Sequence, residues 1–369
     1  MASQRGASFS SLFGADATVR GEAPARVNLM GDHTDYHQGF VLPTVLPHRT
    51  VVDLRLRADR TVRAFSDSMA DGVRQYQRGD ERREGAWIDY VQGVTTLLAS
   101  TGIEIPGFDV FISSTVPIGA GVSSSAALEI ALLRALRQAA SLAITDQQMA
   151  ILAQRAEVEF VGAPVGIMDQ MVCSLGRDGQ ALFLDTRNLH CEHVPLLTTA
   201  DLSLVDSGIA HDNARGSYAD RRRESFEAAA ALGATCLRDV PQSALGELGS
   251  LPEVLARRAR HVVTENARVL RAARALRSDD AVRLGKLFTE SHISMRNDYE
   301  ISTPDIDDLV ITACLDADVY GARLTGGGFG GSVVLLTRAG CAARAAARVV
   351  QTYRQRTRRP GAVLLPVAA

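Results

Sequence analysis

A glycine–serine loop at residues 117–129, Pro-Ile-Gly-Ala-Gly-Val-Ser-Ser-Ser-Ala-Ala-Leu-Glu, constrains the fold more than any other stretch of the chain. Gly119 and Gly121 allow a sharp turn and let a ligand approach the backbone closely, and any of the three serines could cap a helix. Good helix formers continue over residues 124–140. Because free N–H groups and the helix dipole favour negative charge at a helix start, the loop is predicted to bind phosphate.

The composition narrows the kind of phosphate site. The single lysine, Lys286, lies far from the loop, so this is not the common P-loop G-x-x-x-x-G-K-S/T, and protein kinases that need a strand lysine are disfavoured. With 40 basic and 42 acidic residues, the chain gives no reason to expect nucleic-acid or membrane partners. Five cysteines without a C-x-x-C motif argue against a disulfide framework or a zinc site and favour a cytoplasmic location. No apolar run is long enough for a signal peptide or a membrane span.

The chain is long enough for two domains, since it has 369 residues and single cores stop growing near this size. We place the boundary near 195–200, which gives domains 1–198 and 199–369. Hydrophobic patterns predict strands at 50–57, 108–114, 180–185 and 332–336 and helices at 124–140, 147–161, 217–232, 254–276, 281–297 and 309–316. Because strands and helices mix without strict alternation, the predicted class is α+β.

Two further segments concentrate polar groups. Residues 25–39 hold Arg26, Asp32, His33 and Asp35 among glycines, a density that suits a small polyhydroxylated ligand, although a solvated surface turn is an equal alternative. In residues 156–170, the carboxylate of Asp169 follows a loop with glycine and proline and has apolar neighbours in the sequence. Such a carboxylate is paired or functional, unless it merely caps a helix.

Two segments carry weaker signals. Residues 326–331 contain five glycines, which indicate either close approach of the backbone to a ligand or a flexible turn. Trp87 and Tyr90 could offer a stacking face for a base, although an isolated tryptophan is more often part of a core. No common hydrolase motif is present.

Taken in order, these segments resemble the galactokinases, which belong to the superfamily of galacto-, homoserine, mevalonate and phosphomevalonate (GHMP) kinases. The matching segments are Ala25–Gly39, Trp87–Tyr90, Pro117–Glu129, Ala156–Gln170, Gly216–Arg222, Met295–Ser302 and Thr325–Gly331. The resemblance implies a two-domain GHMP kinase fold with an S5-like N-terminal domain, a ferredoxin-like C-terminal domain and the active site in the cleft between them. It also implies ATP- and Mg²⁺-dependent phosphorylation of the C1 hydroxyl of D-galactose.

The resemblance also implies roles for individual residues. Arg26 and Asp169 would flank the anomeric hydroxyl as the catalytic pair, and Ser125 and Glu157 would lie near Mg²⁺. The residues that would bind the sugar are Asp32, His33, Asp35, Tyr218, Gly327 and Gly328. Those that would bind ATP are Gly119, Ala120, Gly121, Val122, Ser123, Ser124 and Ser125 around the triphosphate, with Trp87 and Tyr90 near the adenine.

The sequence departs from the family pattern at three positions: Asp32 replaces a glutamate, His37 an asparagine and Ser217 an acidic residue. In galactokinases that glutamate faces the C6 end of the sugar, so kinases of galacturonate or arabinose remain alternatives. A non-catalytic sugar and ATP sensor is a further alternative, which the complete serine loop and the presence of Arg26 and Asp169 disfavour. A monomer is expected.

Overall fold

Strands and helices alternate in groups along the chain, and the mixture confirms the expected α+β class. The computed structural model describes residues 7–69, 71–209 and 214–365. The chain forms two compact units that are both discontinuous in sequence. Unit 1 comprises Met1–Arg26, Leu46–Pro117 and Ser123–Leu175, and unit 2 comprises Val27–Val45, Ile118–Val122 and Gly176–Ala369. The expected boundary near residue 198 stays a prediction.

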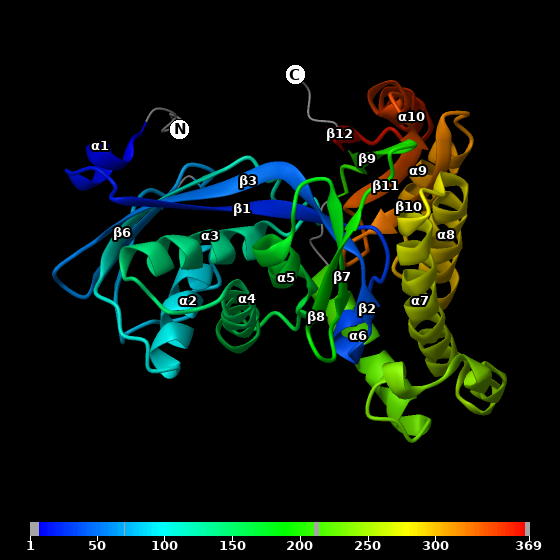
Figure 1. The fold of residues 1–369 in the computed structure, drawn as a ribbon, viewed down its shortest axis with the longest axis horizontal. Helices are drawn as coiled ribbons and strands as arrows, with labels where there is room; N and C mark the ends of the chain where they lie inside the picture. The colour runs from blue at the N-terminus through cyan, green and yellow to red at the C-terminus, as the bar shows by residue number, and fades with distance from the viewer. Residues whose placement is uncertain (1–6, 70, 210–213, 366–369) are drawn as a thin grey trace. The chain divides into compact units, whose positions relative to one another are not determined.

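Unit 1 combines a twisted sheet with a layer of helices. In it, β3 pairs with β6 in antiparallel fashion, β6 with β4 in parallel, and β4 with β5 in antiparallel fashion. Figure 1 shows α2, α3 and α4 on one side of β1, β3 and β6. The bounds are α1 (Phe9–Phe13), β1 (Val19–Asn28), β3 (Pro43–Leu56), β4 (Thr61–Ser66), β5 (Arg74–Gln77), α2 (Ile88–Ser100), β6 (Phe108–Ser114), α3 (Ser124–Ala139), α4 (Asp146–Arg155) and α5 (Met168–Leu175).

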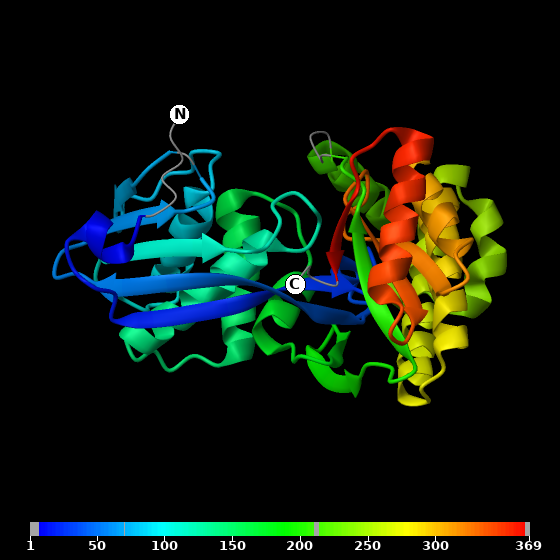
Figure 2. The same ribbon diagram turned by 90° about the horizontal axis from the view of Figure 1, so that it is seen from above.

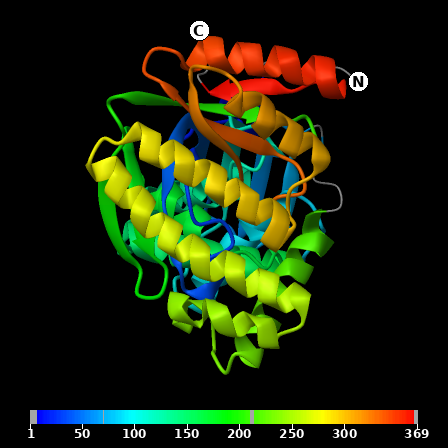
Figure 3. The same cartoon turned by 90° about the vertical axis from the view of Figure 1, so that its right-hand side faces the viewer.

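Unit 2 contains a four-stranded sheet in the order β10-β11-β9-β12. The helices α8, α9 and α10 lie against it (Figure 2), and α7 and α8 run side by side (Figure 3). The bounds are β2 (Phe40–Val41), β7 (Gln180–Asp185), β8 (His190–Pro195), β9 (Ala200–Asp206), α6 (Ala214–Ala231), α7 (Glu253–Arg277), α8 (Ala281–Ser294), α9 (Pro304–Cys314), β10 (Val319–Thr325), β11 (Ser332–Arg338), α10 (Ala342–Thr357) and β12 (Ala362–Leu365).

Close backbone contact fixes α8 onto β10. A Cβ atom on Gly321 would lie 2.0 Å from the carbonyl oxygen of Gly285, and one on Gly285 would lie 2.4 Å from that of Tyr320. Only glycine fits at both positions, which lets the helix settle directly onto the strand. The strand that is held in this way leads into the glycine-rich segment at 326–331.

Two helices end in a π-helical turn. Residues Ala156–Val161 (η2) continue from α4, and residues Met295–Tyr299 (η5) continue from α8. The sequence patterns predicted single helices over 147–161 and 281–297, and the structure widens the last turn of each. Such turns are rare and are frequently found at functional sites; here they carry Glu157 and Tyr299. In the part of the chain that the structure describes, no helix is both long and apolar enough to cross a membrane.

Candidate functional site

The carboxylate of Asp32 is buried in unit 2 and held on both sides. The side chain is only 2% exposed. Its Oδ2 pairs with a guanidinium nitrogen of Arg323, and its Oδ1 accepts a hydrogen bond from the backbone N–H of Gly326 at 3.0 Å. Burial raises the pKa of Asp32, and the positive charge of Arg323 opposes this effect. Asp32 therefore joins the segment after β1 to the glycine-rich segment after β10.

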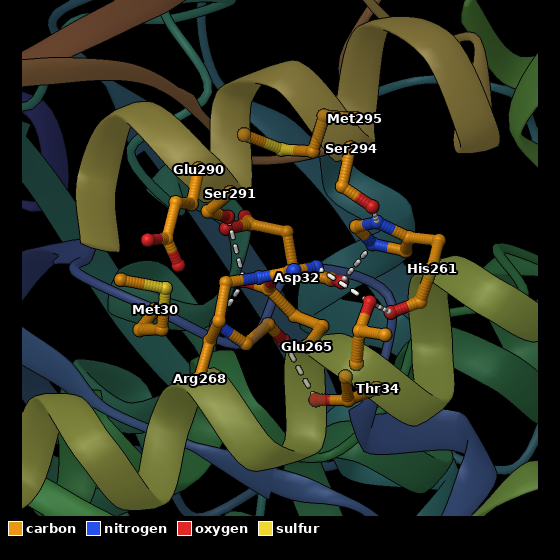
Figure 4. A network of polar contacts seen from close by, with 12 residues as sticks. Met30, Asp32, Thr34, His261, Glu265, Arg268, Glu290, Ser291, Ser294 and Met295 are labelled. Atoms are coloured by element: carbon orange, nitrogen blue, oxygen red, sulfur yellow. Dashed lines mark hydrogen bonds and ion pairs between the residues drawn. The ribbon is translucent and has the colours of Figure 1, made fainter. Parts of the chain in front are cut away.

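A second buried carboxylate, that of Glu265 on α7, lies close to Asp32 (Figure 4). It accepts hydrogen bonds from the amide of Gly31 at 3.0 Å, from the hydroxyl of Ser291 at 2.8 Å and from Arg268 Nε at 2.6 Å. Burial alone would raise the pKa of Glu265, but Arg268 and then Arg323 outweigh it and lower the pKa to about 2. The carboxylate is thus ionised at neutral pH.

His33, Tyr218 and Gly327, three of the residues expected to bind the sugar, come together in unit 2. The rings of His33 and Tyr218 have centroids 5.1 Å apart, and a Cβ atom on Gly327 would lie 3.4 Å from Tyr218. The ring nitrogen Nδ1 of His33 is 2.8 Å from the hydroxyl of Tyr36, which is 2.8 Å from that of Tyr299. Burial lowers the pKa of His33 to about 3, so the imidazole is neutral near pH 7.

The other two predicted sugar residues border this group. Asp35 begins a short 3-10 turn (Asp35–His37), and its Oδ1 accepts a hydrogen bond from the N–H of Tyr36 at 3.0 Å. Gly328 has φ +84°, and a Cβ atom there would lie 2.6 Å from that of Ile301. Gly328 is therefore a position where only glycine fits, because its backbone packs directly against Ile301.

Asp169 lies in the first turn of α5 in unit 1 and is gripped by Arg26. The guanidinium donates two hydrogen bonds, from Nε to Oδ1 and from Nη2 to Oδ2, both at 2.7 Å. The hydroxyl of Ser123 donates a third, to Oδ2 at 2.5 Å. The carboxylate keeps 26% of its surface exposed. A fork-to-fork pair of this kind fixes the direction of the carboxylate, and its open side can accept a proton.

Glu157, the predicted metal ligand, lies near Asp169 and is held by Gln170. The amide of Gln170 donates to Glu157 Oε2 at 2.7 Å, and both side chains are buried. Burial and then Asp169 raise the pKa of Glu157 to about 7, while a hydrogen bond from Ser125 lowers it. Ser125 and Glu157 are thus in hydrogen-bond contact, and their expected position near Mg²⁺ stays a prediction. Among residues 7–69, 71–209 and 214–365, no group of three or more His, Cys, Asp or Glu side chains could hold a metal ion.

The glycine–serine loop turns sharply just before α3. Gly119, Gly121 and Ser123 all have φ between 64° and 78°, and Gly119 is exposed with open space around it. In unit 2 the hydroxyl of Ser332 donates to the carbonyl of Ala120 at 2.8 Å and anchors the loop. The buried Val122 completes the loop, and α3 begins at Ser124. A glycine-rich turn that leads into the start of a helix is the kind of backbone that binds an anion.

Trp87 and Tyr90 lie one turn apart at the start of α2. The indole N–H of Trp87 donates to the carboxylate of Asp71 at 2.9 Å, and both aromatic residues are half-buried. Their expected position near the adenine stays a prediction.

Known family models match three segments of the chain. The galactokinase galactose-binding signature matches residues 7–55, the GHMP kinase N-terminal domain matches 89–177 and the GHMP kinase C-terminal domain matches 272–355. The galactokinase of Streptomyces coelicolor is 43% identical over 346 residues, which are 90% of this chain and 88% of that protein. The chain belongs to the galactokinase family. The galactokinase of Roseiflexus sp. is 44% identical and covers 89% of this chain and 85% of its own length.

Solved structures agree with membership in the galactokinase family. Lactococcus lactis galactokinase complexed with galactose has a TM-score of 0.89 and 29% identity, and the match covers 96% of this chain and 95% of that one. A mevalonate kinase matches with a TM-score of 0.67 and 17% identity over 94% of this chain and 98% of its own, which shows the shared fold. The GHMP kinase fold that the sequence predicted is confirmed.

Sequence reasoning missed several residues that hold the site in place. Tyr36 and Tyr299 support His33, Gln170 supports Glu157, and Glu265 supports Gly31. Glu129 on α3 is also fully buried, and burial and then Glu157 raise its pKa well above the usual range. Gln170, Glu129 and Tyr299 stood inside matched motifs without an assigned role, whereas no local pattern pointed to Glu265.

His37, which departs from the family asparagine, makes acid stability testable. It is buried, its Nε2 is 2.7 Å from the hydroxyl of Ser225, and burial lowers its pKa from 6.5 to about 3. Below pH 6.5 the unfolded state binds a proton that the folded state does not bind, so stability falls as pH drops toward 3. We expect His37→Asn to reduce the loss of unfolding free energy between pH 7 and pH 5 by about 2 kcal/mol.

The measurement is urea unfolding of both proteins at the two pH values. His190→Asn, at an exposed position of β8, serves as the matched control and should leave the pH dependence unchanged. An equal pH dependence in His37→Asn and the parent protein would contradict the assignment of His37 as a neutral buried imidazole.

Proposed function

We propose that the protein transfers the γ-phosphoryl group of ATP to the C1 hydroxyl of D-galactose and forms α-D-galactose 1-phosphate. The observation that carries this proposal is the Asp169 carboxylate, which is fixed by two 2.7 Å hydrogen bonds from Arg26 and one from Ser123. Phosphoryl transfer requires mainly positioning and charge stabilisation from a protein. A carboxylate held in one direction beside a fixed cation offers both.

Asp169 would accept the proton of the C1 hydroxyl, or orient that hydroxyl, as the oxygen attacks phosphorus. Arg26 is 4% exposed and would stabilise the charge that develops near the reacting oxygen. General base catalysis by a positioned side chain contributes about 10²–10⁴-fold to the rate. The two residues form the catalytic pair of the proposal.

The backbone amides of residues 119–125 would hold the triphosphate of ATP, and Trp87 and Tyr90 would lie beside its adenine. Glu157 and Ser125 would hold Mg²⁺. Their oxygen donors fit this ion because Mg²⁺ prefers oxygen ligands and is usually bound through one or two carboxylates together with phosphates. When bound, the ion would offset the negative charge of the phosphates.

The sugar hydroxyls would be recognised by Asp32, His33, Asp35, Tyr218, Gly327 and Gly328. A buried polar side chain that is left without its sugar hydroxyl costs about 1–3 kcal/mol of binding free energy. Each such contact would therefore discriminate strongly between epimers. All five cysteines are free thiols, which supports a location in the reducing cytoplasm. We also propose that the protein is a monomer.

One observation favours a second substrate class. The carboxylate of Asp32 is almost fully buried and both of its oxygens already have protein partners. Aspartate is also one methylene shorter than the family glutamate. The Asp32 carboxylate is therefore less available than that glutamate to a group at the C6 end of a sugar. A sugar that differs from galactose at C5 or C6, such as galacturonate or arabinose, is therefore the second candidate.

The test is a panel of hexoses, uronic acids and pentoses with ATP and Mg²⁺, scored for ADP release, with ³¹P NMR to locate the phosphate. We expect galactose to give the highest kcat/KM and a product phosphorylated at C1. A higher kcat/KM for a C5 or C6 variant would transfer the proposal to that sugar. Sugar binding without ADP release from any member of the panel would instead indicate a sensor.

A further inference from the structure

Glu265 is the acceptor in unit 2 at which hydrogen bonds from several separate segments meet. It lies in the middle of α7, is fully buried, and accepts hydrogen bonds from Gly31, Arg268 and Ser291 at 2.6–3.0 Å. A nitrogen of the buried Arg323 lies 3.9 Å from its Oε1. A buried carboxylate is tolerated only when it is paired and hydrogen-bonded, and these partners meet that condition.

Two of these partners lead directly to the segment that we assign to the sugar. Gly31 has φ +102°, and a Cβ atom there would lie 2.6 Å from the carbonyl oxygen of Phe40, so its peptide has one orientation that only glycine allows. The N–H of that peptide donates to Glu265. Arg323 lies between Glu265 and Asp32 and also donates to the carbonyl of Leu29 at 2.7 Å.

The Glu265 carboxylate therefore acts on the Gly31–Asp32 segment in two ways. It accepts a hydrogen bond from the amide of Gly31, the residue just before Asp32. It also lies beside Arg323, the cation that pairs with the Asp32 carboxylate. Asp32 in turn accepts a hydrogen bond from the amide of Gly326 at 3.0 Å. The position of the Asp32 carboxylate therefore also fixes the start of the glycine-rich segment. Figure 4 shows Glu265, Ser291 and His261 from α7 and α8 gathered around Asp32.

We propose that Glu265 is a positioning residue for sugar recognition, which fixes the Gly31 peptide and, through Arg323, the Asp32 carboxylate. This inference rests on the proposed function. Glu265 is not expected to touch the sugar, because it is fully buried and its carboxylate is already hydrogen-bonded to Gly31, Arg268 and Ser291. Its effect should appear in the affinity for the sugar and leave the affinity for ATP unchanged.

A purely structural role is the competing explanation, because Glu265 also joins α7 to α8 through Ser291. The two explanations separate cleanly in two variants. Glu265→Gln keeps the shape and one acceptor but removes the charge that Arg268 and Arg323 share. Ser291→Ala removes the contact with α8 and leaves the contacts with Gly31 and Arg323 in place, so it is the matched control.

The experiment measures galactose binding by calorimetry without ATP, KM for galactose, KM for ATP and Tm for both variants and the parent protein. We expect Glu265→Gln to raise the Kd and KM for galactose about 10- to 100-fold, because this is the effect of losing one charge-assisted hydrogen bond. KM for ATP should stay within about twofold of the parent value. Ser291→Ala should lower Tm while both KM values stay near those of the parent.

Unchanged galactose affinity in folded Glu265→Gln would overturn the inference, and so would an equal rise of both KM values. If Glu265→Gln does not fold, Glu265→Asp replaces it, because aspartate keeps the charge but is one methylene shorter. This variant must likewise lose affinity for galactose and keep its KM for ATP. Failure of the parent protein to bind or phosphorylate galactose would instead reject the proposed function, so the two failures are distinguishable.

Discussion

Asp169→Asn is expected to lower kcat by about 10²–10⁴-fold while leaving the protein folded. The amide cannot accept the proton of the attacking hydroxyl. Its NH₂ group would also face a guanidinium that now donates to both carboxylate oxygens at 2.7 Å. The measurement is single-turnover formation of sugar phosphate, with galactose binding followed by calorimetry and Tm by thermal unfolding.

Asp16→Asn is the matched control, because Asp16 is an exposed carboxylate of the same unit and should keep the parental rate. We expect galactose binding to survive in Asp169→Asn. A parental kcat in that variant would remove Asp169 from the chemistry, and the proposed function would then lose the observation on which it rests.

Arg323→Met is expected to destabilise the protein by about 3–5 kcal/mol, which corresponds to a Tm lower by roughly 4–7 °C. Arg323 is fully buried, pairs with Asp32 and lies 3.9 Å from Glu265. Methionine fills a similar volume, but it leaves Asp32 without its cation and the carbonyl of Leu29 without a donor. Removal of one partner from a buried ionic network leaves uncompensated charge, which is the dominant cost.

The comparison is Arg356→Met, which removes a cation from α10 that pairs with Asp308 at the surface. Exposed pairs contribute little, so its Tm should stay within about 2 °C of the parent value. Equal Tm values for the two variants would show that the Asp32–Arg323 pair contributes no more than a surface pair.

The local elements of this fold could be predicted from sequence because their signals are local. Apolar residues at helical spacing predicted a helix over 254–276, and the structure has Glu253–Arg277. The strand at 108–114 was predicted with the bounds that the structure shows. The first turn of the predicted helix after the glycine–serine loop also begins where expected, at Ser124.

The long-range features could not be predicted in this way. Glu265 and Arg323 lie on elements far apart in sequence, and periodicity says only that such positions face inward, not which charges meet there. The widened turns at Ala156–Val161 and Met295–Tyr299 leave no mark in a pattern of apolar residues. Short strands such as Phe40–Val41 carry too few residues for an alternating pattern. The roles of Asp169, Asp32 and Glu157 came from motif resemblance, since a lone carboxylate in a loop has several ordinary explanations.

The interleaved course of the chain limits how it can be cut or recombined. Val27–Val45 and Ile118–Val122 belong to unit 2 although the residues on both sides of each belong to unit 1. A fragment that starts after Leu175 would retain Glu265, Arg268 and Arg323 but lack Gly31 and Asp32, so two arginines would share one acid. Neither unit can therefore be produced alone, or exchanged with that of a relative, as a single uninterrupted piece of the gene.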